Sequence, residues 1–163
     1  MLRPYREINE MRNCSKELGS LALGVALFGC SAPIGPIPGG TLSGELASWP
    51  ENWAHVEDRE NVLLQTNPED PYSVTIWGLG LGSDFYIAAS KRTNRWAQYL
   101  EADPSVVLNV DGKLYEATAS RVSGAEEALP VSVAFRAKYD VQGHRDFENE
   151  GSFYRLTARP TAN

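Results

Sequence analysis

A two-residue turn between two alternating segments is the feature of this sequence that most restricts its fold. Asp111-Gly112 suits the positive backbone angles of a tight hairpin, because such turns match the twist of the strands they join. Apolar and polar residues alternate on both sides of the turn. The residues expected to share a face are Val106, Leu108 and Val110 before it and Tyr115, Ala117 and Ala119 after it. The sequence therefore predicts an antiparallel hairpin here.

Further short segments with strand character lie on either side of this hairpin. They are residues 61–66, 72–79, 85–89 and 153–159. Turn-forming residues separate the first three of them: NPEDP follows the first, and a glycine-rich stretch at 80–84 precedes the third. With the two strands of the hairpin these segments make six, and we expect about seven in all. So many short strands are more than one flat sheet needs, and closing the sheet removes its exposed edges. We therefore expect a mainly β (α+β) fold, a small antiparallel barrel with two short helices.

The first predicted helix covers residues 94–102. Thr93 or Asn94 provides a polar cap, and Trp96 and Leu100 fall on one face at a spacing of four residues. Asp103-Pro104 then ends the helix, because the residue before a proline disfavours helical backbone angles.

The second predicted helix begins at Ser123 and runs towards Tyr139. Ser123 and Glu126 have the spacing of a capping box, in which each side chain bonds the backbone of the other. Pro130 lacks a backbone N–H, so we expect a break at Leu129 and a fresh helix that starts at the proline.

The N-terminal segment has the pattern of a secretory signal. Leu18 to Gly29 is an uncharged run of twelve residues, LGSLALGVALFG, preceded by Arg12 and Lys16. The run is too short to cross a bilayer as a helix, which needs about 20 residues. We therefore predict a signal peptide at residues 1–29, with Met11 as an alternative start of the chain.

The end of this run, Leu27-Phe28-Gly29-Cys30, resembles the bacterial lipobox. That resemblance implies a lipid on Cys30 and a membrane-anchored lipoprotein on the extracytoplasmic face of the bacterial cell envelope. Residues 30–41, rich in proline and glycine, are then a flexible lipidated tether, and residues 42–163 form the barrel domain. An ordinary signal peptide that contains a cysteine, or a buried N-terminal helix, are the alternatives.

Charge and cysteine content restrict the partners of the chain. The sequence has 15 basic and 21 acidic residues, a net charge of −6, without the cluster of cations that a nucleic acid requires, so we expect no nucleic-acid partner. Cys14 leaves with the signal and Cys30 carries lipid, so no disulfide forms in the mature chain. Two cysteines far from the two histidines do not make a zinc site, and we expect no metal.

A cluster of cations precedes the first helix. Ser90, Lys91, Arg92, Thr93 and Arg95 bring two hydroxyls and three positive charges to a helix N-terminus, where free N–H groups and the helix dipole favour an anion. These residues indicate a phosphate site. The alternative is a solvated turn whose cations pair with Asp84, Glu101 or Asp103.

Several of these features together resemble the flavin-binding split-barrel superfamily. They are Ser90-Lys91-Arg92, Trp96, Asp103-Pro104 and Asp111-Gly112, and the likeness spans residues 61–139. The deazaflavin-dependent nitroreductase branch is the most similar, with pyridoxamine-phosphate-oxidase-like proteins further away. The resemblance implies a split β-barrel and FMN or a deazaflavin held by Ser90, Lys91, Arg92, Thr93, Arg95 and Trp96.

The resemblance also implies a homodimer with the cofactor at the subunit interface. If the protein is a flavin- or deazaflavin-dependent oxidoreductase, the cofactor supplies the hydride chemistry, and we assign no catalytic side chain.

Two departures from the family pattern support a second hypothesis. The loop at 67–71 carries Glu69 and Asp70 where the family has a basic stretch, and Tyr99 replaces a common asparagine. Carboxylates repel a phosphate group. The alternative function is therefore that of a non-catalytic ligand-binding or protein-interaction lipoprotein without the cofactor.

Aromatic residues are numerous for a domain of this size. They could line a pocket for a planar ligand, but in so small a domain we favour the core. The residues in question are Trp49, Trp53, Tyr72, Trp77, Phe85, Tyr86, Trp96 and Tyr99.

Overall fold

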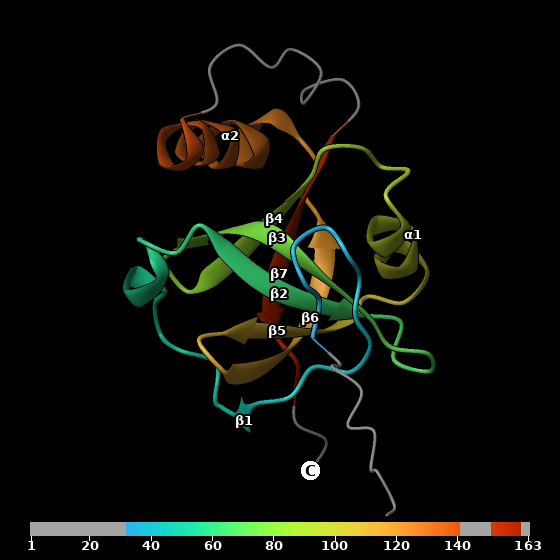
Figure 1. Ribbon diagram of the computed structural model, residues 1–163. Helices are drawn as coiled ribbons and strands as arrows, with labels where there is room; N and C mark the ends of the chain where they lie inside the picture. Colours follow the sequence, from blue (N-terminus) through green and yellow to red (C-terminus); the bar gives the residue numbers. More distant parts are fainter. Residues whose placement is uncertain (1–31, 141–150, 161–163) are drawn as a thin grey trace, which may run out of the picture.

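The computed structural model describes residues 32–140 and 151–160 (Figure 1). Seven strands and three helical segments follow one another along this part of the chain. They are β1 (Glu45–Leu46), the 3-10 turn η1 (Ala54–Val56), β2 (Asn61–Thr66), β3 (Tyr72–Leu81), β4 (Asp84–Ala89), α1 (Arg95–Ala102), β5 (Ser105–Val110), β6 (Lys113–Arg121), α2 (Ala125–Tyr139) and β7 (Ser152–Ala158).

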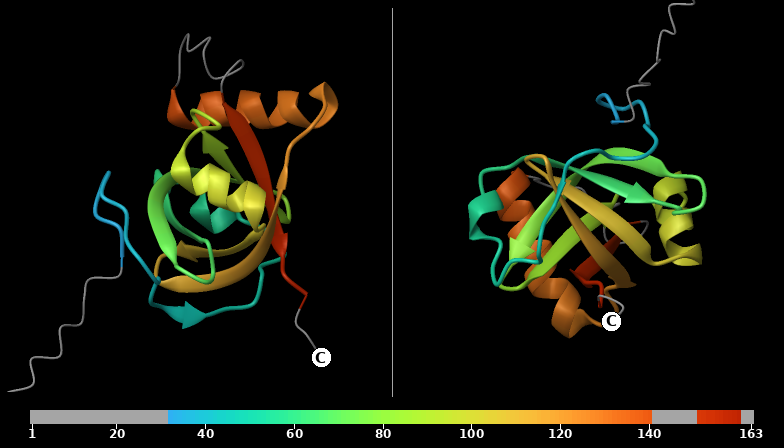
Figure 2. Two further views of the ribbon diagram at one scale, coloured as in Figure 1. Left: turned by 90° about the vertical axis from the view of Figure 1, so that its right-hand side faces the viewer. Right: turned by 90° about the horizontal axis from the view of Figure 1, so that it is seen from below.

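Six of the strands close into an antiparallel barrel, as the sequence predicts. The strand order is β1-β6-β5-β2-β3-β4-β7, and pairing between β6 and β7 closes strands β2 to β7 into a ring. The short β1 adds to β6 in parallel, outside the closed ring. The two views of Figure 2 show the barrel from its side and from below, with α1 and α2 on its outer surface.

The predicted hairpin at Asp111-Gly112 is confirmed. Both residues have positive φ, 52° and 82°, and Val110 pairs with Lys113 on either side of them. Asn109 supports the turn from inside, because its Oδ1 accepts the Gly112 N–H at 3.0 Å and its Nδ2 donates to the Ser43 carbonyl at 3.0 Å. A second two-residue turn, Gly82-Ser83, joins β3 to β4, so β3 is two residues longer than expected.

Trp53 lies at the centre of a group of aromatic side chains in the barrel interior, which is otherwise filled by aliphatic residues. This residue precedes η1, is 2% exposed, and contacts Phe85 and Tyr115 at ring-centre distances of 4.8 and 5.0 Å. Two glycines of β3 provide the space. A Cβ at Gly78 would lie 2.6 Å from the Phe85 ring, and one at Gly80 would overlap the Cβ of Trp53. The preference for a core role of these aromatic residues is thus confirmed for Trp53 and Phe85.

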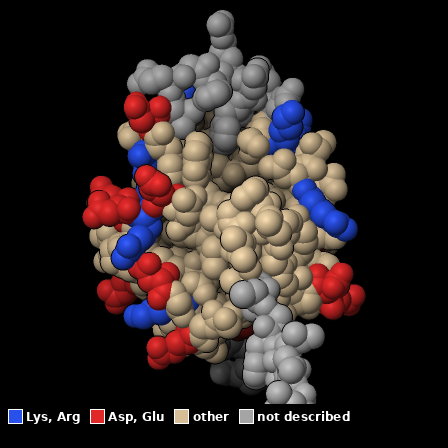
Figure 3. Space-filling view, in the orientation of Figure 1, with Lys and Arg blue, Asp and Glu red and all other residues tan. Residues whose placement is uncertain are grey.

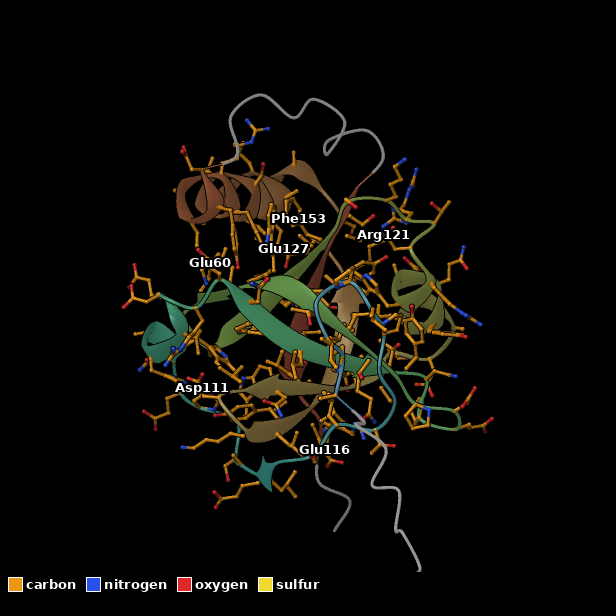
Figure 4. The ribbon with its side chains drawn as sticks, viewed as in Figure 1. Glu60, Asp111, Glu116, Arg121, Glu127 and Phe153 are labelled. Carbon is orange, nitrogen blue, oxygen red and sulfur yellow. The ribbon has the colours of Figure 1, made fainter. Side chains whose placement is uncertain are left out.

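α2 covers the outer face of β3 and β4, where a second apolar cluster forms. Its buried members are Leu79, Tyr86, Val131 and Phe135. Phe153 of β7 joins it, with its ring 5.2 Å from that of Phe135. Figure 4 shows Glu127 and Phe153 on this side, between α2 and the barrel. Glu127 closes the edge of the cluster, because its Oε1 accepts the Tyr86 hydroxyl at 3.4 Å and lies 3.3 Å from Arg155.

The expected break at Leu129 is wrong, because α2 runs without interruption through Pro130. Pro130 is the sixth residue of the helix, so its missing N–H removes only the bond to the Glu126 carbonyl. The residues after it are buried: Val131 is 1% exposed and Phe135 is 5% exposed. Burial of these two side chains against the barrel offsets the loss of one hydrogen bond.

The expected capping box is also wrong. Gly124 is the N-cap of α2, with φ 94° and ψ 143°, and no side chain bonds the first turn. The sequence pattern requires Ser123 at the N-cap and Glu126 three residues later. Gly124 has a positive φ, a backbone angle that other residues rarely adopt, and it takes the N-cap position in place of Ser123. Glu126 is then two residues after the N-cap instead of three, so the capping box cannot form.

Residues 1–31, with the predicted signal peptide, Cys14 and the lipidation site Cys30, lie outside the described residues. The expected tether reaches residue 41, but its described part is joined to the barrel. Pro33 is buried, and Gly39 and Ser73 exchange two backbone hydrogen bonds of 2.9 Å. Among the described helices, none combines the length and the apolar character needed to cross a bilayer.

The fit of β3 around Trp53 gives a stability prediction. Replacing Gly80 by alanine forces a methyl group against the Trp53 side chain, so we expect the free energy of unfolding to fall by roughly 2 kcal/mol. Urea denaturation measures this as a lower midpoint. Gly40→Ala is the matched control, since its Cβ would meet only the Pro71 carbonyl, at 3.8 Å, and we expect a change within about 0.5 kcal/mol. Equal midpoints for the two variants would contradict the close packing.

Candidate functional site

α1 is fixed to the barrel by its apolar face. Trp96, Ala97 and Leu100 are buried, as the spacing of Trp96 and Leu100 predicts. The Trp96 ring meets Tyr154 of β7 edge-on at 6.0 Å, and the Tyr154 hydroxyl donates to Glu101 Oε1 at 2.9 Å. These contacts place the N-terminus of α1, and the loop before it, at a defined position on the rim of the barrel.

The structure places the predicted cationic loop at the surface, directly before α1. Ser90, Lys91, Arg92, Thr93 and Arg95 are all exposed, whereas Trp96 points into the core. In Figure 3, Lys and Arg side chains are visible along the right-hand edge of this face of the molecule. The loop is shaped by a turn in which the Asn94 N–H donates to the Lys91 carbonyl at 3.1 Å.

The first turn of α1 has no side-chain cap. Asn94 occupies the N-cap position, but its Nδ2 points back to Ser90 Oγ at 3.5 Å, and no side chain bonds the helix amides. There is also no acidic residue in the first turn. The N-terminal amides and the positive end of the helix dipole thus remain directed towards the loop cations.

Arg95 is held against two tyrosines. Its Nε donates to the Tyr99 hydroxyl at 3.0 Å, and its guanidinium carbon lies 5.6 Å from the ring centres of both Tyr72 and Tyr99. The two rings meet edge-on at 5.5 Å. Tyr99 stands where the family commonly has asparagine, and it accepts one hydrogen bond from Arg95. The terminal N–H groups of Arg95 therefore remain for other partners.

Two carboxylates that could have paired with the loop cations have other partners. Glu101 Oε1 accepts the Tyr154 hydroxyl, and Asp103 Oδ1 accepts the Ser105 N–H at 2.8 Å. The hydrogen bonds from Ser105 lower the pKa of Asp103. Glu101 and Asp103 therefore each accept a hydrogen bond from a neighbouring strand of the barrel.

The acidic loop at 67–71 lies at the same end of the barrel as the cationic loop. It joins β2 to β3 on the right of Figure 1, beside α1, and leads directly into Tyr72. Asn67, with φ 57°, shapes the loop, because its Nδ2 donates to the Asp70 carbonyl at 2.7 Å. Glu69 and Asp70 are exposed, so negative charge lies on the other side of the Arg95–Tyr72–Tyr99 cluster.

A small pocket lies next to α1, bordered by Trp96. Its volume is about 120 Å³, and its other walls are residues 35–38 and residues 74–76 of β3. Ligand pockets usually measure about 300–1,000 Å³, so this one is too small for a complete flavin. Apart from Trp96, none of the residues predicted to hold a cofactor is among its walls.

A larger pocket, of about 590 Å³, lies elsewhere, between η1, the β3–β4 turn and the end of α2. Its apolar wall includes Trp53, Leu79 and Leu81, and its polar residues include Glu57 and Lys138. Lys138 Nζ donates to the carbonyls of Gly78 at 2.8 Å and Val56 at 3.2 Å. Burial lowers the pKa of this amine.

Tyr139, the next residue, fixes the end of α2 beside this pocket. Its hydroxyl accepts the Gly78 N–H at 2.9 Å, and its ring stacks on Trp77 at 4.5 Å. Burial raises the pKa of Tyr139. No sequence motif marks Lys138 or Tyr139 as a functional residue, although the spacing of Val131, Phe135 and Tyr139 indicates an apolar helix face that reaches this position.

The aromatic residues divide between core and surface. Trp53, Phe85, Tyr86 and Trp96 are buried, whereas Trp77 is 42% exposed and lies outside the barrel. No group of three or more potential metal ligands occurs within residues 32–140 and 151–160.

Comparison with known proteins identifies the fold. No family model matches the sequence, and no curated protein matches it. A protein from Listeria innocua, described as a candidate pyridoxamine 5′-phosphate oxidase, is 10% identical with a TM-score of 0.52, and the match covers 66% of this chain and 90% of that one. A candidate 5-nitroimidazole antibiotic resistance protein from Bacteroides thetaiotaomicron is 9% identical with a TM-score of 0.52, over 64% and 76% of the two chains.

A third solved structure, described as a domain-swapped dimer, is 19% identical with a TM-score of 0.51 over 63% of this chain and 84% of that one. At these identities the likeness is one of fold. This protein therefore has the split-barrel architecture that the sequence resemblance implies.

The contact that holds α1 gives a pH prediction. Burial and the bond to Glu101 raise the pKa of Tyr154 to about 12, from an ordinary value of 10.0. The native state therefore holds this proton more tightly than the unfolded state, and the stability it contributes is complete below pH 10.0 and is lost as the pH rises towards 12. Tyr154→Phe should lower the free energy of unfolding at neutral pH by about 1 kcal/mol. The variant should also lose less stability than the wild-type protein as the pH rises from 10.0 towards 12. Urea midpoints across this pH range measure both effects, and parallel curves for the two proteins would contradict the role of Tyr154.

Proposed function

We propose that this protein is a lipid-anchored domain that binds the phosphate group of FMN or a deazaflavin at the loop before α1. The observation that carries the proposal is the exposed loop with Lys91 and Arg92 in front of an uncapped helix N-terminus. Charge-assisted hydrogen bonds to phosphate are among the stronger ones available, and helix amides add further donors.

The donors present fit a phosphate ester. Ser90 and Thr93 offer hydroxyls, Lys91 and Arg92 offer charge, and the remaining N–H groups of Arg95 point from a side chain already held by Tyr99. When bound, a flavin supplies hydride chemistry, while the chain binds and orients it. On this proposal, any enzymatic activity is that of a flavin- or deazaflavin-dependent oxidoreductase.

The described similar structures support this proposal at the level of fold. One is a candidate pyridoxamine 5′-phosphate oxidase and another a candidate 5-nitroimidazole resistance protein. A third is a domain-swapped dimer, which supports a homodimer here.

A second function is favoured by the acidic loop at 67–71. Glu69 and Asp70 are exposed beside Tyr72, and Arg95 already gives its Nε–H to Tyr99. Both features weaken a phosphate site. The alternative is a non-catalytic lipoprotein that has kept the barrel and binds a different ligand or a protein.

Titration with FMN and with riboflavin distinguishes the two functions. If the loop binds phosphate, FMN should bind and riboflavin, which lacks the phosphate, should bind much more weakly. Lys91→Ala combined with Arg92→Ala should weaken FMN binding by about 100-fold, because each charge-assisted contact contributes roughly 1.5 kcal/mol. The same titration with a deazaflavin tests the other cofactor, and flavin fluorescence or calorimetry provides the measurement.

The control is Arg59→Ala combined with Lys113→Ala. This variant removes the same charge near the Asp111 turn, where Arg59 and Asp111 form an exposed ion pair of 3.0 Å. FMN affinity should then change little. Absence of binding to any flavin or deazaflavin would leave only the non-catalytic function.

We also propose that the lipid on Cys30 anchors the protein at the extracytoplasmic face of the cell envelope. The support is the sequence pattern, with an apolar run of twelve residues ending at Gly29-Cys30. Several acyl chains on one cysteine give stable attachment, because each buried methylene contributes about 0.8 kcal/mol.

Cys30→Ser tests this attachment. The variant should move from the membrane fraction to the soluble fraction of bacterial cells and should lack the added mass of the lipid. Mass spectrometry and fractionation measure these two effects, with Cys14→Ser as the control that retains the anchor. Membrane retention of the Cys30→Ser protein would exclude the proposed lipid as its cause.

A further inference from the structure

We infer that the turn at residues 34–37 contacts the bilayer surface and determines which face of the barrel meets the membrane. This inference rests on the proposed lipid at Cys30 and goes beyond it, because a lipid alone keeps a protein near the bilayer without choosing its orientation. The turn lies in the first part of the chain that the structure describes.

The turn presents two large apolar side chains to solvent. Ile34 and Ile37 are each 64% exposed, and Gly35 between them has φ 55°, the angle that closes the turn. Both views of Figure 2 show this segment, in blue, projecting from the barrel. Transfer of exposed isoleucine side chains from water into the apolar part of a bilayer is favourable.

The backbone of the turn is suited to an apolar surrounding. The Ile34 N–H donates to the Ile37 carbonyl at 3.0 Å, and the Ile37 N–H donates to the Ile34 carbonyl at 3.0 Å. Pro33, Pro36 and Pro38 have no N–H to satisfy. Residues 33–38 therefore enter the interface with few unpaired backbone donors, which would otherwise oppose insertion.

The position of Cys30 restricts how far the turn can lie from the bilayer. Four steps of the chain separate Cys30 from Ile34, so their Cα atoms are at most about 14 Å apart. The sequence also has no charged residue from Leu18 to Gly44. A lipid at Cys30 thus brings an uncharged segment with two exposed isoleucines to the headgroup region.

The turn is joined firmly enough to the barrel to transmit an orientation. Pro33 is buried before it, and Gly39 after it pairs with Ser73 of β3. Residues 35–38 also line the small pocket with Val74, Ile76 and Trp96. The membrane would therefore lie on the β3 side of the barrel, close to α1.

The chemistry of this contact is apolar rather than electrostatic. Residues 30–163 carry 11 basic and 18 acidic residues, so the mature chain is repelled by anionic lipids. Figure 3 shows uncharged side chains over the middle of the face that the turn crosses, with charged ones mainly towards its edges. Contact should therefore occur on zwitterionic phosphatidylcholine.

A fluorescent label at position 37 tests the contact. Without the signal, and with Cys30 lipidated, the chain has no free thiol, so Ile37→Cys takes up one label on the full lipidated protein. Leu129→Cys is the matched control, because Leu129 is 66% exposed on α2. In phosphatidylcholine vesicles with brominated acyl chains, we expect bromine to quench the label at 37 and the label to lose most of its quenching by aqueous iodide. The label at 129 should remain open to iodide.

Each other result overturns the inference and identifies the cause. Equal access of iodide to both labels, on protein that floats with the vesicles, would leave the anchor intact and show that the turn stays in water. Bromine quenching of both labels would show a different orientation. Shielding of position 37 without bromine quenching would show that a second copy or another protein covers the turn. Protein that does not float and carries no lipid would refute the anchor itself, and the inference with it.

Discussion

The packing of Trp53 inside the barrel is the constraint on which the rest of the structure depends. Its ring contacts Trp49 at 4.9 Å as well as Phe85 and Tyr115, and so joins the segment before β2 to strands β4 and β6. Its Nε1 is buried with no hydrogen-bond partner. The structure tolerates this unfavourable burial because the aromatic contacts outweigh it.

This packing also explains why the candidate sites lie on the outside. With Trp53 packed in the interior, both of the pockets described above lie where another element packs against the barrel wall. α2 and η1 create the pocket around Lys138, whereas α1 and the segment at 35–38 create the small pocket beside Trp96. The helical segments therefore determine where these two pockets form, and strand β3 provides a wall of each.

Local features of the sequence predicted the fold better than the sites. The Asp111-Gly112 turn and the alternation around it depend on neighbouring residues, so they predict a hairpin directly. The continuity of α2 through Pro130 depends instead on burial of Val131 and Phe135 against other strands. The contact of Arg95 with Tyr99 follows from helical spacing, but its contact with Tyr72 does not. The Lys138 site was missed because Val56, Gly78 and Lys138 come from distant segments.

The way the barrel closes has a consequence for folding. β7 pairs with β4 on one side and β6 on the other, yet it follows every other strand in the sequence. Until this segment is in place, the folding sheet keeps two unprotected edges, and unpaired edges recruit other strands. A chain truncated just before Ser152 should thus aggregate rather than persist as a partly folded monomer.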